Sequence, residues 1–173
     1  MTNNDVLRRI RYILDYNNKT MLSIFSLGGR NLSIEQLKQQ LKKDIDSDFL
    51  NCSDINLASF LNGLIIKKRG DKDGLRPQAE KNITNNMIFT KLKIAFNLTS
   101  DDILEILSSI DFHLSAHELS SFFRKRTHKN HRECKDQVLR NFLKGLQIKY
   151  RDQDDLEEIE ASSIWKPLPS HKK

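Results

Sequence analysis

Hydrophobic residues along this chain recur with the spacing of α-helices, and the same pattern occurs twice. Between residues 5 and 15, apolar side chains fall at i, i+1, i+4, i+7 and i+8, which places them on one helical face. An equivalent face lies 82 residues further along the chain. Its ten positions are Val6, Leu7, Ile10, Ile13 and Leu14, then Ile88, Phe89, Leu92, Ala95 and Phe96. No segment shows the sustained period-two alternation of a strand, so the pattern predicts an all-α protein.

The duplication extends far beyond this first helix. Residues 3–69 align with residues 85–151 without a gap, and 19 of the 67 positions are identical. A unit of this size has a marginal core alone, so we expect the two repeats to pack together across their most apolar faces. The predicted fold is a tandem pseudo-symmetric repeat of two four-helix units. The predicted parts are a first repeat (1–69), a linker (70–82), a second repeat (83–151) and an acidic, then proline-containing, flexible tail (152–173).

Four helices can be predicted in each repeat. Asn4 and Asn86 are expected to cap the first helix. The third opens with a capping box in both copies, in which a serine hydroxyl and the side chain three residues later satisfy reciprocal backbone donors. In the first repeat the expected ranges are about 5–15, 19–27, 33–43 and 53–69. The capping boxes are Ser33 with Gln36 and Ser115 with Glu118, and the fourth helix of the second repeat is expected over about 135–151.

Glycines mark two further features. Gly63 and Gly145 occupy equivalent positions inside the fourth helix, where glycine costs about 1 kcal/mol relative to alanine. Their presence in both copies predicts that another helix crosses there without room for a Cβ. Gly28 and Gly29 are expected to end the second helix. The second copy has Ile110 and Asp111 there, so the pattern predicts a turn that needs no positive φ.

The charge is distributed unevenly along the chain. The net charge is +6, and residues 152–173 carry −3, which leaves +9 on the repeats and linker. Such a basic body suits a polyanionic partner, or a tail that screens the body electrostatically. No apolar run approaches the length of a membrane span, and the N-terminus lacks the pattern of a signal peptide. We therefore expect a cytoplasmic protein that does not enter a membrane.

The two copies differ most between the third and fourth helices. Residues 124–132 carry five positive charges, whereas the equivalent residues 42–50 are mixed and partly acidic. Clustered cations can bind phosphates, and the adjacent Phe122 or Phe123 offers a ring for base stacking. The alternative is a solvated loop, with Phe122 or Phe123 in the core. The candidate nucleic-acid-binding residues are Arg124, Lys125, Arg126, Lys129 and Arg132 in this loop, with Lys91, Lys93, Arg9 and Arg11 if the first helices face the same side.

Metal and thiol chemistry are weaker hypotheses. His128, His131 and Cys134 have ligand-type side chains at short spacings, but the first copy has Asp46 and Phe49 in place of the histidines. The positive charge of the loop also disfavours a dication. Cys52 and Cys134 lie at equivalent helix starts, where a thiolate can be favoured, although small buried side chains are the commoner case. No glycine-rich phosphate loop or nucleophile elbow is present, so the sequence predicts neither a resident metal or cofactor nor an enzyme.

Several separate motifs resemble those of a known family. Residues 3–12 (NNDVLRRIRY), 60–65 (FLNGLI), 128–134 (HKNHREC) and 141–146 (NFLKGL) are similar to the YehS family of small bacterial proteins. The resemblance covers residues 3–151 and implies a bacterial cytoplasmic protein with a duplicated domain of unknown function. It implies no catalytic residues. The leading hypothesis is therefore binding of nucleic acid or another polyanion by the basic loop. An adaptor that holds a protein partner in a groove between the repeats is the alternative, and a metal- or thiol-dependent enzyme is a weaker one.

Overall fold

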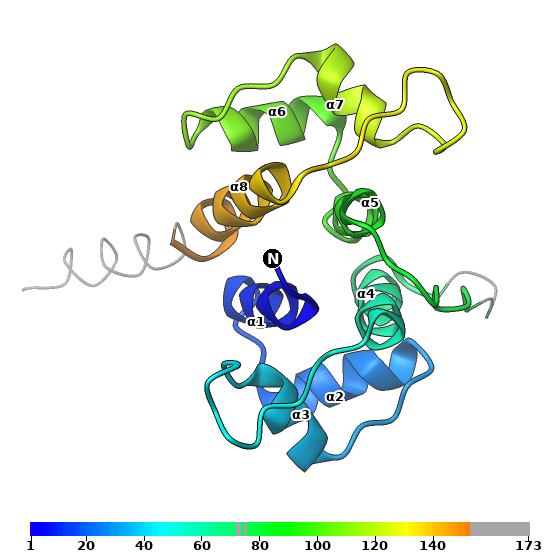
Figure 1. Ribbon diagram of the computed structural model, residues 1–173, viewed down its shortest axis with the longest axis vertical. Helices are drawn as coiled ribbons and strands as arrows, with labels where there is room; N and C mark the ends of the chain where they lie inside the picture. Colours follow the sequence, from blue (N-terminus) through cyan, green and yellow to red (C-terminus); the bar gives the residue numbers. More distant parts are fainter. Residues whose placement is uncertain (72–73, 75, 153–173) are drawn as a thin grey trace, which may run out of the picture.

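The computed structural model describes residues 1–71, 74 and 76–152, and the regular secondary structure of this part of the chain is helical (Figure 1). Eight α-helices and one π-helical turn occur in it, with no strand. The prediction of an all-α tandem repeat is confirmed, while the predicted tail lies outside the described residues from position 153 onward. The elements are α1 (Asn3–Ile13), α2 (Asn18–Leu27), α3 (Ile34–Leu41), α4 (Asp54–Arg69), α5 (Asn85–Ala95), α6 (Ser100–Ser108), α7 (Ala116–Phe122), α8 (Asp136–Gln147) and the π-helical turn η1 (Ile148–Asp152).

The two repeats are arranged about an approximate two-fold axis. Helices α1, α4, α5 and α8 lie side by side in the middle of the molecule, with α2 and α3 at one end and α6 and α7 at the other (Figure 1). Helix α4 packs on α5, and α8 packs on α1. The first helix of each repeat thus contacts the fourth helix of the other. Buried apolar residues of both repeats form one continuous core.

The two fourth helices are buried to different extents. Every residue from Leu57 to Leu64 of α4 is buried, because α2 and α5 cover it on different sides. Helix α8 keeps Arg140 and Lys144 exposed at the positions that correspond to Ala58 and Asn62. Its α-helical part ends at Gln147, and η1 replaces the α-helix that was predicted to reach Arg151. The seam between α4 and α5 is therefore closer than the seam between α8 and α1.

The predicted N-caps of the first helices are wrong. Thr2 caps α1, since its side chain accepts a hydrogen bond from Asp5 N at 3.1 Å, and Thr84 caps α5 in the same way. Both helices begin earlier than expected, which places Asn4 and Asn86 inside the first turn. The capping boxes at Ser33 and Ser115 are confirmed.

The glycine predictions are partly correct. A Cβ on Gly63 would lie 1.8 Å from the carbonyl oxygen of Ile24, and one on Gly145 would lie 2.5 Å from Ile106 Cγ2. The expected close crossing of α2 over α4, and of α6 over α8, is thus present. The turn after the second helix, however, uses positive φ in both copies, at Gly29 (+84°) and at Asp111 (+59°). An aspartate can adopt this left-handed conformation, so glycine is not needed there.

Candidate nucleic-acid interface

The basic loop between α7 and α8 is anchored by the side chain of Asn86. Asn86 Nδ2 donates to the carbonyl oxygens of Phe122 (3.0 Å) and Arg132 (2.8 Å), and Asn86 Oδ1 accepts from Cys134 N (2.9 Å). In the first repeat, Asn4 makes the same three bonds to Gln40, Leu50 and Cys52. One asparagine per repeat therefore closes the loop between the third and fourth helices.

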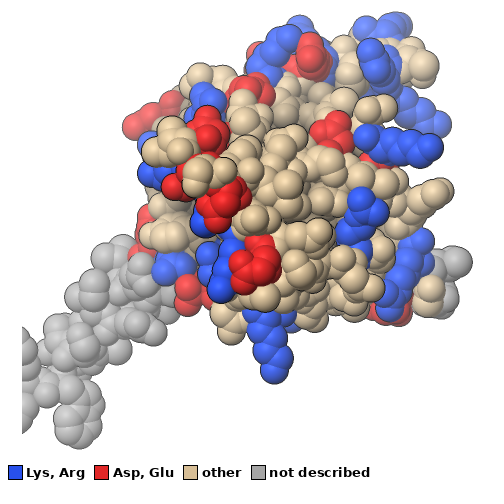
Figure 2. All heavy atoms as spheres, turned by 60° about the horizontal axis from the view of Figure 1, so that its bottom comes forward, with Lys and Arg blue, Asp and Glu red and all other residues tan. Residues whose placement is uncertain are grey.

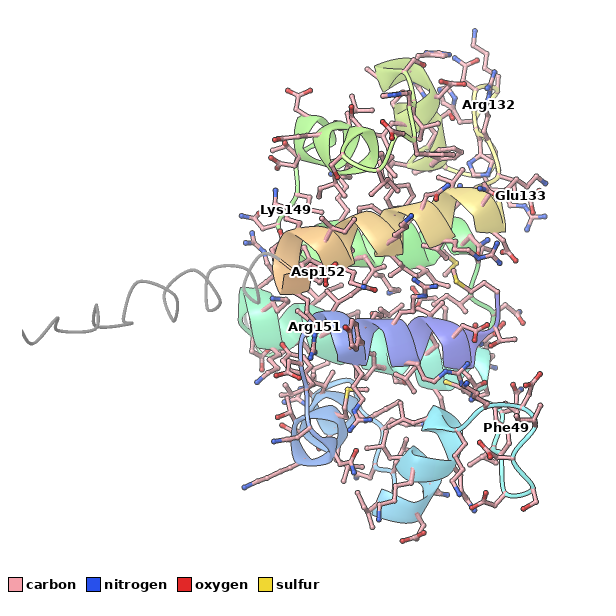
Figure 3. All side chains as sticks on the ribbon, turned by 90° about the vertical axis from the view of Figure 1, so that its left-hand side faces the viewer. Phe49, Arg132, Glu133, Lys149, Arg151 and Asp152 are labelled. Atoms are coloured by element: carbon pink, nitrogen blue, oxygen red, sulfur yellow. The ribbon has the colours of Figure 1, made fainter. Side chains whose placement is uncertain are left out.

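Both loops follow the same hydrogen-bonded path. In the second repeat, His128 N donates to Lys125 O and His131 N to His128 O, each at 2.8 Å. The equivalent bonds in the first repeat join residues 46 to 43 and 49 to 46, at 3.0 and 3.1 Å. Figure 3 shows Phe49 and Arg132 at opposite ends of the molecule but on the same side of it, away from Arg151 and Asp152. The two loops thus share a backbone path and a side of the molecule, and differ in their side chains.

The two loops differ in charge and in the ion pairs that they form. Within the described residues, none of the five cations of the second loop forms a salt bridge with a carboxylate. In the first loop, Lys42 is paired with Asp48. Figure 2 shows Lys and Arg predominating along the edge where α5 and the linker lie, whereas both signs mix on the opposite side. Arg124 is half-buried, and the exposed members are Lys125, Arg126, Lys129 and Arg132.

Lys91 and Lys93 of α5 have different surroundings. Lys91 Nζ lies 3.0 Å from Glu80 Oε1 and donates to Asn62 Oδ1 at 2.6 Å, so its charge is already balanced by the linker. Lys93 Nζ lies 5.5 Å from the centre of the Phe123 ring and makes no ion pair within the described residues. Lys93 is therefore the α5 residue whose charge can add to that of the loop.

Arg9 and Arg11 lie on α1, diagonally across the central helices from α5 (Figure 1). Arg9 lines a small hollow with Arg8 and Arg140, and Arg11 Nε donates to Tyr16 O at 3.0 Å. The structure therefore places the nine candidate residues in two groups. The loop and α5 form one, and α1 forms the other.

The two rings expected for base stacking, those of Phe122 and Phe123, are buried to different extents. Phe122 is only 7 % exposed and packs on Phe89 in the core. Phe123 is half-buried, with its ring centre 5.2 Å from that of Phe89 and Lys93 over it. Phe123 is thus the ring of this pair that remains accessible.

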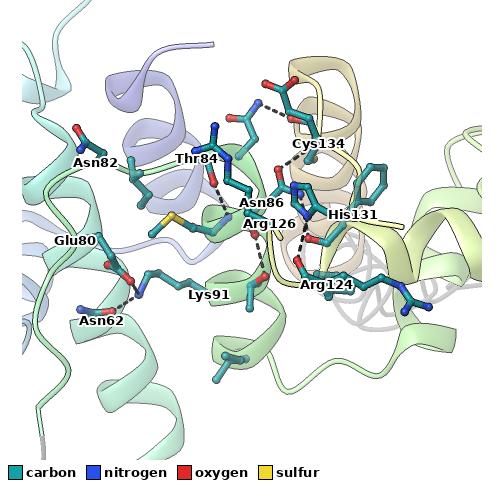
Figure 4. Close-up of a pocket in the computed structure, with 18 of the residues that line it drawn as sticks. Asn62, Glu80, Asn82, Thr84, Asn86, Lys91, Arg124, Arg126, His131 and Cys134 are labelled. Atoms are coloured by element: carbon teal, nitrogen blue, oxygen red, sulfur yellow. Dashed lines mark hydrogen bonds and ion pairs between the residues drawn. The ribbon is translucent and has the colours of Figure 1, made fainter. Parts of the chain in front are cut away.

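A groove of about 1220 Å³ runs along α5 beneath the basic loop (Figure 4). Arg124, Arg126 and His131 lie on one side of it, and Asn62, Glu80 and Lys91 lie on the other. Apolar side chains line the space between these two sides, and they are Ile65, Ile83, Met87, Ile94 and Phe123. The groove therefore brings together the linker, α4, α5 and the basic loop at the close seam between the repeats.

The three side chains proposed as weak metal ligands have other surroundings in the described structure. His128 Nδ1 accepts from Asn130 N at 3.0 Å, and a ring nitrogen of His131 lies 3.0 Å from Arg124 O. Cys134 is buried beneath the loop. Across the described ranges, no three histidine, cysteine or acidic side chains are grouped to hold a metal ion.

Both cysteines are buried free thiols that suit packing and not catalysis. Burial, together with the nearby Asp54, raises the pKa of the Cys52 thiol to about 12. Burial and Asp136 raise the pKa of Cys134 to about 12 as well. The thiolate expected from a helix N-terminus is therefore disfavoured at both positions, because desolvation penalises the charged form.

Sequence reasoning offered a groove between the repeats as an alternative site but identified none of its lining residues, and it missed the role of the asparagines. Asn4 falls three residues before Leu7, on the buried face of α1, and the same residue type recurs at 86. A polar residue at a core position of both copies is a signal for a buried hydrogen-bonding role. The groove had no such signal, because Met87, Thr90 and Asn62 come together only when α4 packs on α5.

These observations define a class of protein: an all-helical duplicated domain whose copies share a loop backbone and differ in loop charge. Residues 3–70 and 85–152 each match the family described as "Protein of unknown function (DUF1456)", and the chain belongs to this family. It is 47% identical over 148 residues to the uncharacterized protein YehS of Escherichia coli (strain K12), an alignment that covers 84% of this chain and 94% of that protein. No solved structure matches the chain. In the described part, no helix is both long and apolar enough to cross a membrane.

Proposed function

We propose that the protein binds nucleic acid or another polyanion through the basic loop of its second repeat. The observation that supports this proposal is the set of five cations in residues 124–132 that form no salt bridge in the described part. They stand on a backbone closed by Asn86, so they are presented on a structured loop. Phosphates provide the strongest general attraction for such a cluster, because binding releases their condensed counterions.

The salt dependence of binding tests this proposal. If all five cations contact phosphates of duplex DNA, the slope of log K against log salt is about −4.5, since each contact contributes about −0.9. Changing Arg124, Lys125 and Arg126 together to Glu should abolish binding, measured by fluorescence anisotropy with labelled oligonucleotides. A matched control changes Lys19, Lys38 and Lys43 to Glu, which alters the net charge equally at exposed positions of the first repeat.

The two variants separate local from general charge effects. The control should retain binding within about threefold, because charges more than a Debye length from the contact are largely screened. The proposal is wrong if the loop variant binds as well as the parent, or if both variants lose binding equally.

An adaptor role is the second candidate, and the groove at the seam is the observation that favours it. Its apolar lining and charged sides are features of a peptide-binding surface. Such binding should depend weakly on salt, because apolar burial would contribute most of the affinity. A steep salt dependence that the loop variant removes would argue against this candidate.

A further inference from the structure

The groove beside α5 lies where the two repeats differ at two positions on their first helices. In the first repeat, Arg8 donates to Lys42 O and pairs with Asp5, so these side chains occupy the space between α1 and its loop. The equivalent residues in the second repeat are Thr90 and Met87. The Thr90 hydroxyl turns back onto Asn86 O at 2.8 Å, within its own helix. The second repeat therefore lacks the side-chain contact that Arg8 makes with its loop in the first, and Met87 and Thr90 line the groove instead.

The groove offers both charge and apolar surface to a ligand. Arg124 and Arg126 lie on one side and form no salt bridge in the described part, and Arg124 Nε is buried without a hydrogen-bond acceptor. On the other side, Glu80 Oε2 is a buried acceptor without a donor. Ile94 is 45 % exposed at the groove, and the accessible ring of Phe123 lies nearby. This arrangement suits a ligand with anionic groups on one side and flat, hydrogen-bonding rings on the other.

We infer that the groove binds a short stretch of single-stranded nucleic acid, an inference that rests on the proposed polyanion binding by the loop. Unpaired bases expose their faces and edges, so they can lie against Ile94 and Phe123 and donate an amino hydrogen to Glu80. The phosphates then lie along Arg124 and Arg126. A duplex keeps its base faces stacked inside and can contact only the outer loop. The volume of about 1220 Å³ exceeds the roughly 300–1,000 Å³ of a small-molecule pocket, which favours a segment of a polymer.

Continuity of charge favours a nucleic acid over an acidic peptide as this polymer. The cations of the groove continue directly into Lys125, Lys129 and Arg132 on the exposed loop. A nucleic acid carries one phosphate per nucleotide and can follow such a row, whereas a peptide would need a run of acidic residues at matching positions.

A variant that transfers the first repeat's ion pair into the groove tests the inference. Met87→Asp with Thr90→Arg leaves the net charge unchanged and keeps every residue of the loop. The probes are a 12-nucleotide single strand and the duplex of the same sequence, measured by anisotropy. We expect the single strand to bind about tenfold more weakly to the variant, which is the effect of losing about one stacked base. Duplex binding, which uses the outer loop, should stay within about twofold.

A second variant guards against misfolding of the first. Ile94→Gln removes apolar surface at a half-exposed helical position and retains a good helix former. This variant should bind the single strand about threefold to tenfold more weakly than the parent and bind the duplex as tightly as the parent does. Circular dichroism should show the same helical content for both variants and the parent.

The outcomes distinguish this inference from the proposal on which it rests. If both variants fold and bind the single strand like the parent while the loop variant does not, the groove inference fails and the loop proposal stands. If the loop variant also binds like the parent, both fail. If a synthetic peptide of alternating Glu and Leu binds the parent, and the single strand does not, the groove inference is overturned in favour of the adaptor.

Discussion

Replacing Asn4 by alanine should destabilise the protein more than replacing its counterpart Asn86. The Asn4 side chain is wholly buried, and it makes three hydrogen bonds of 2.8 to 2.9 Å to the backbone of the loop that joins α3 to α4. Alanine leaves two carbonyl oxygens and one N–H group without partners. Asn86 makes the same bonds but is half-buried, so water can replace its amide.

The magnitude follows from the number of groups left without partners. Each hydrogen bond contributes about 1 kcal/mol net, and a buried group left unpaired costs about 1–3 kcal/mol. Asn4→Ala should therefore reduce the free energy of unfolding by about 3–5 kcal/mol, and Asn86→Ala by about 1–2 kcal/mol. For a chain of this length, a loss of 3 kcal/mol lowers Tm by roughly 6–12 °C.

Equilibrium unfolding in guanidinium chloride, followed by circular dichroism at 222 nm, measures these differences. Asn51→Ala is the matched control, because Asn51 lies exposed in the same loop and makes no hydrogen bond within the described residues. It should change stability by less than about 0.5 kcal/mol. The reasoning is refuted if Asn4→Ala falls within 1 kcal/mol of this control, or if Asn86→Ala is the more destabilising change.

Two further predictions concern the helix crossings and the thiols. Gly63→Ala should destabilise by at least about 3 kcal/mol and Gly145→Ala by a smaller amount, because the new Cβ would lie 1.8 Å from the carbonyl oxygen of Ile24 in the first case, but 2.5 Å from Ile106 Cγ2 and 2.9 Å from Ile106 O in the second. Denaturation midpoints check this order, and equal effects would contradict it. Cys52 and Cys134 should resist alkylation by iodoacetamide at pH 8 until the protein unfolds, so rapid labelling of native protein would contradict their burial. Because their pKa values are raised to about 12, the folded state retains protons that the unfolded state loses above about pH 9, and stability should fall as pH rises from there.

Much of the fold was predictable because both repeats carry the same information. The apolar faces, the capping boxes at Ser33 and Ser115, and the tight crossings at Gly63 and Gly145 are local patterns that occur twice. The errors came from competing local chemistry. Thr2 satisfies the donors that Asn4 was expected to satisfy, and Asp111 adopts the positive φ that was expected to be unnecessary.

The candidate site was less predictable, because its parts come together only in the folded molecule. The charge of residues 124–132 is visible in the sequence, but the pairing of Lys91 with Glu80 depends on the path of the linker. The distance of Arg9 from the loop depends on how the repeats pack. The burial of Phe122 but not Phe123 likewise depends on the position of Phe89 in the core.

The approximate two-fold axis has a consequence for how the two loops can differ. If two identical single-repeat chains paired in this way, each residue of one subunit would occur again in the other, and a substitution that opened one groove would open both. Joining the repeats in one chain removes that constraint. One copy can keep a hydrogen bond from Arg8 of its first helix to the carbonyl oxygen of Lys42 in its loop, while the other copy has threonine at that position and lacks this contact. The covalent link thus allows a symmetric scaffold to carry a single, one-sided groove.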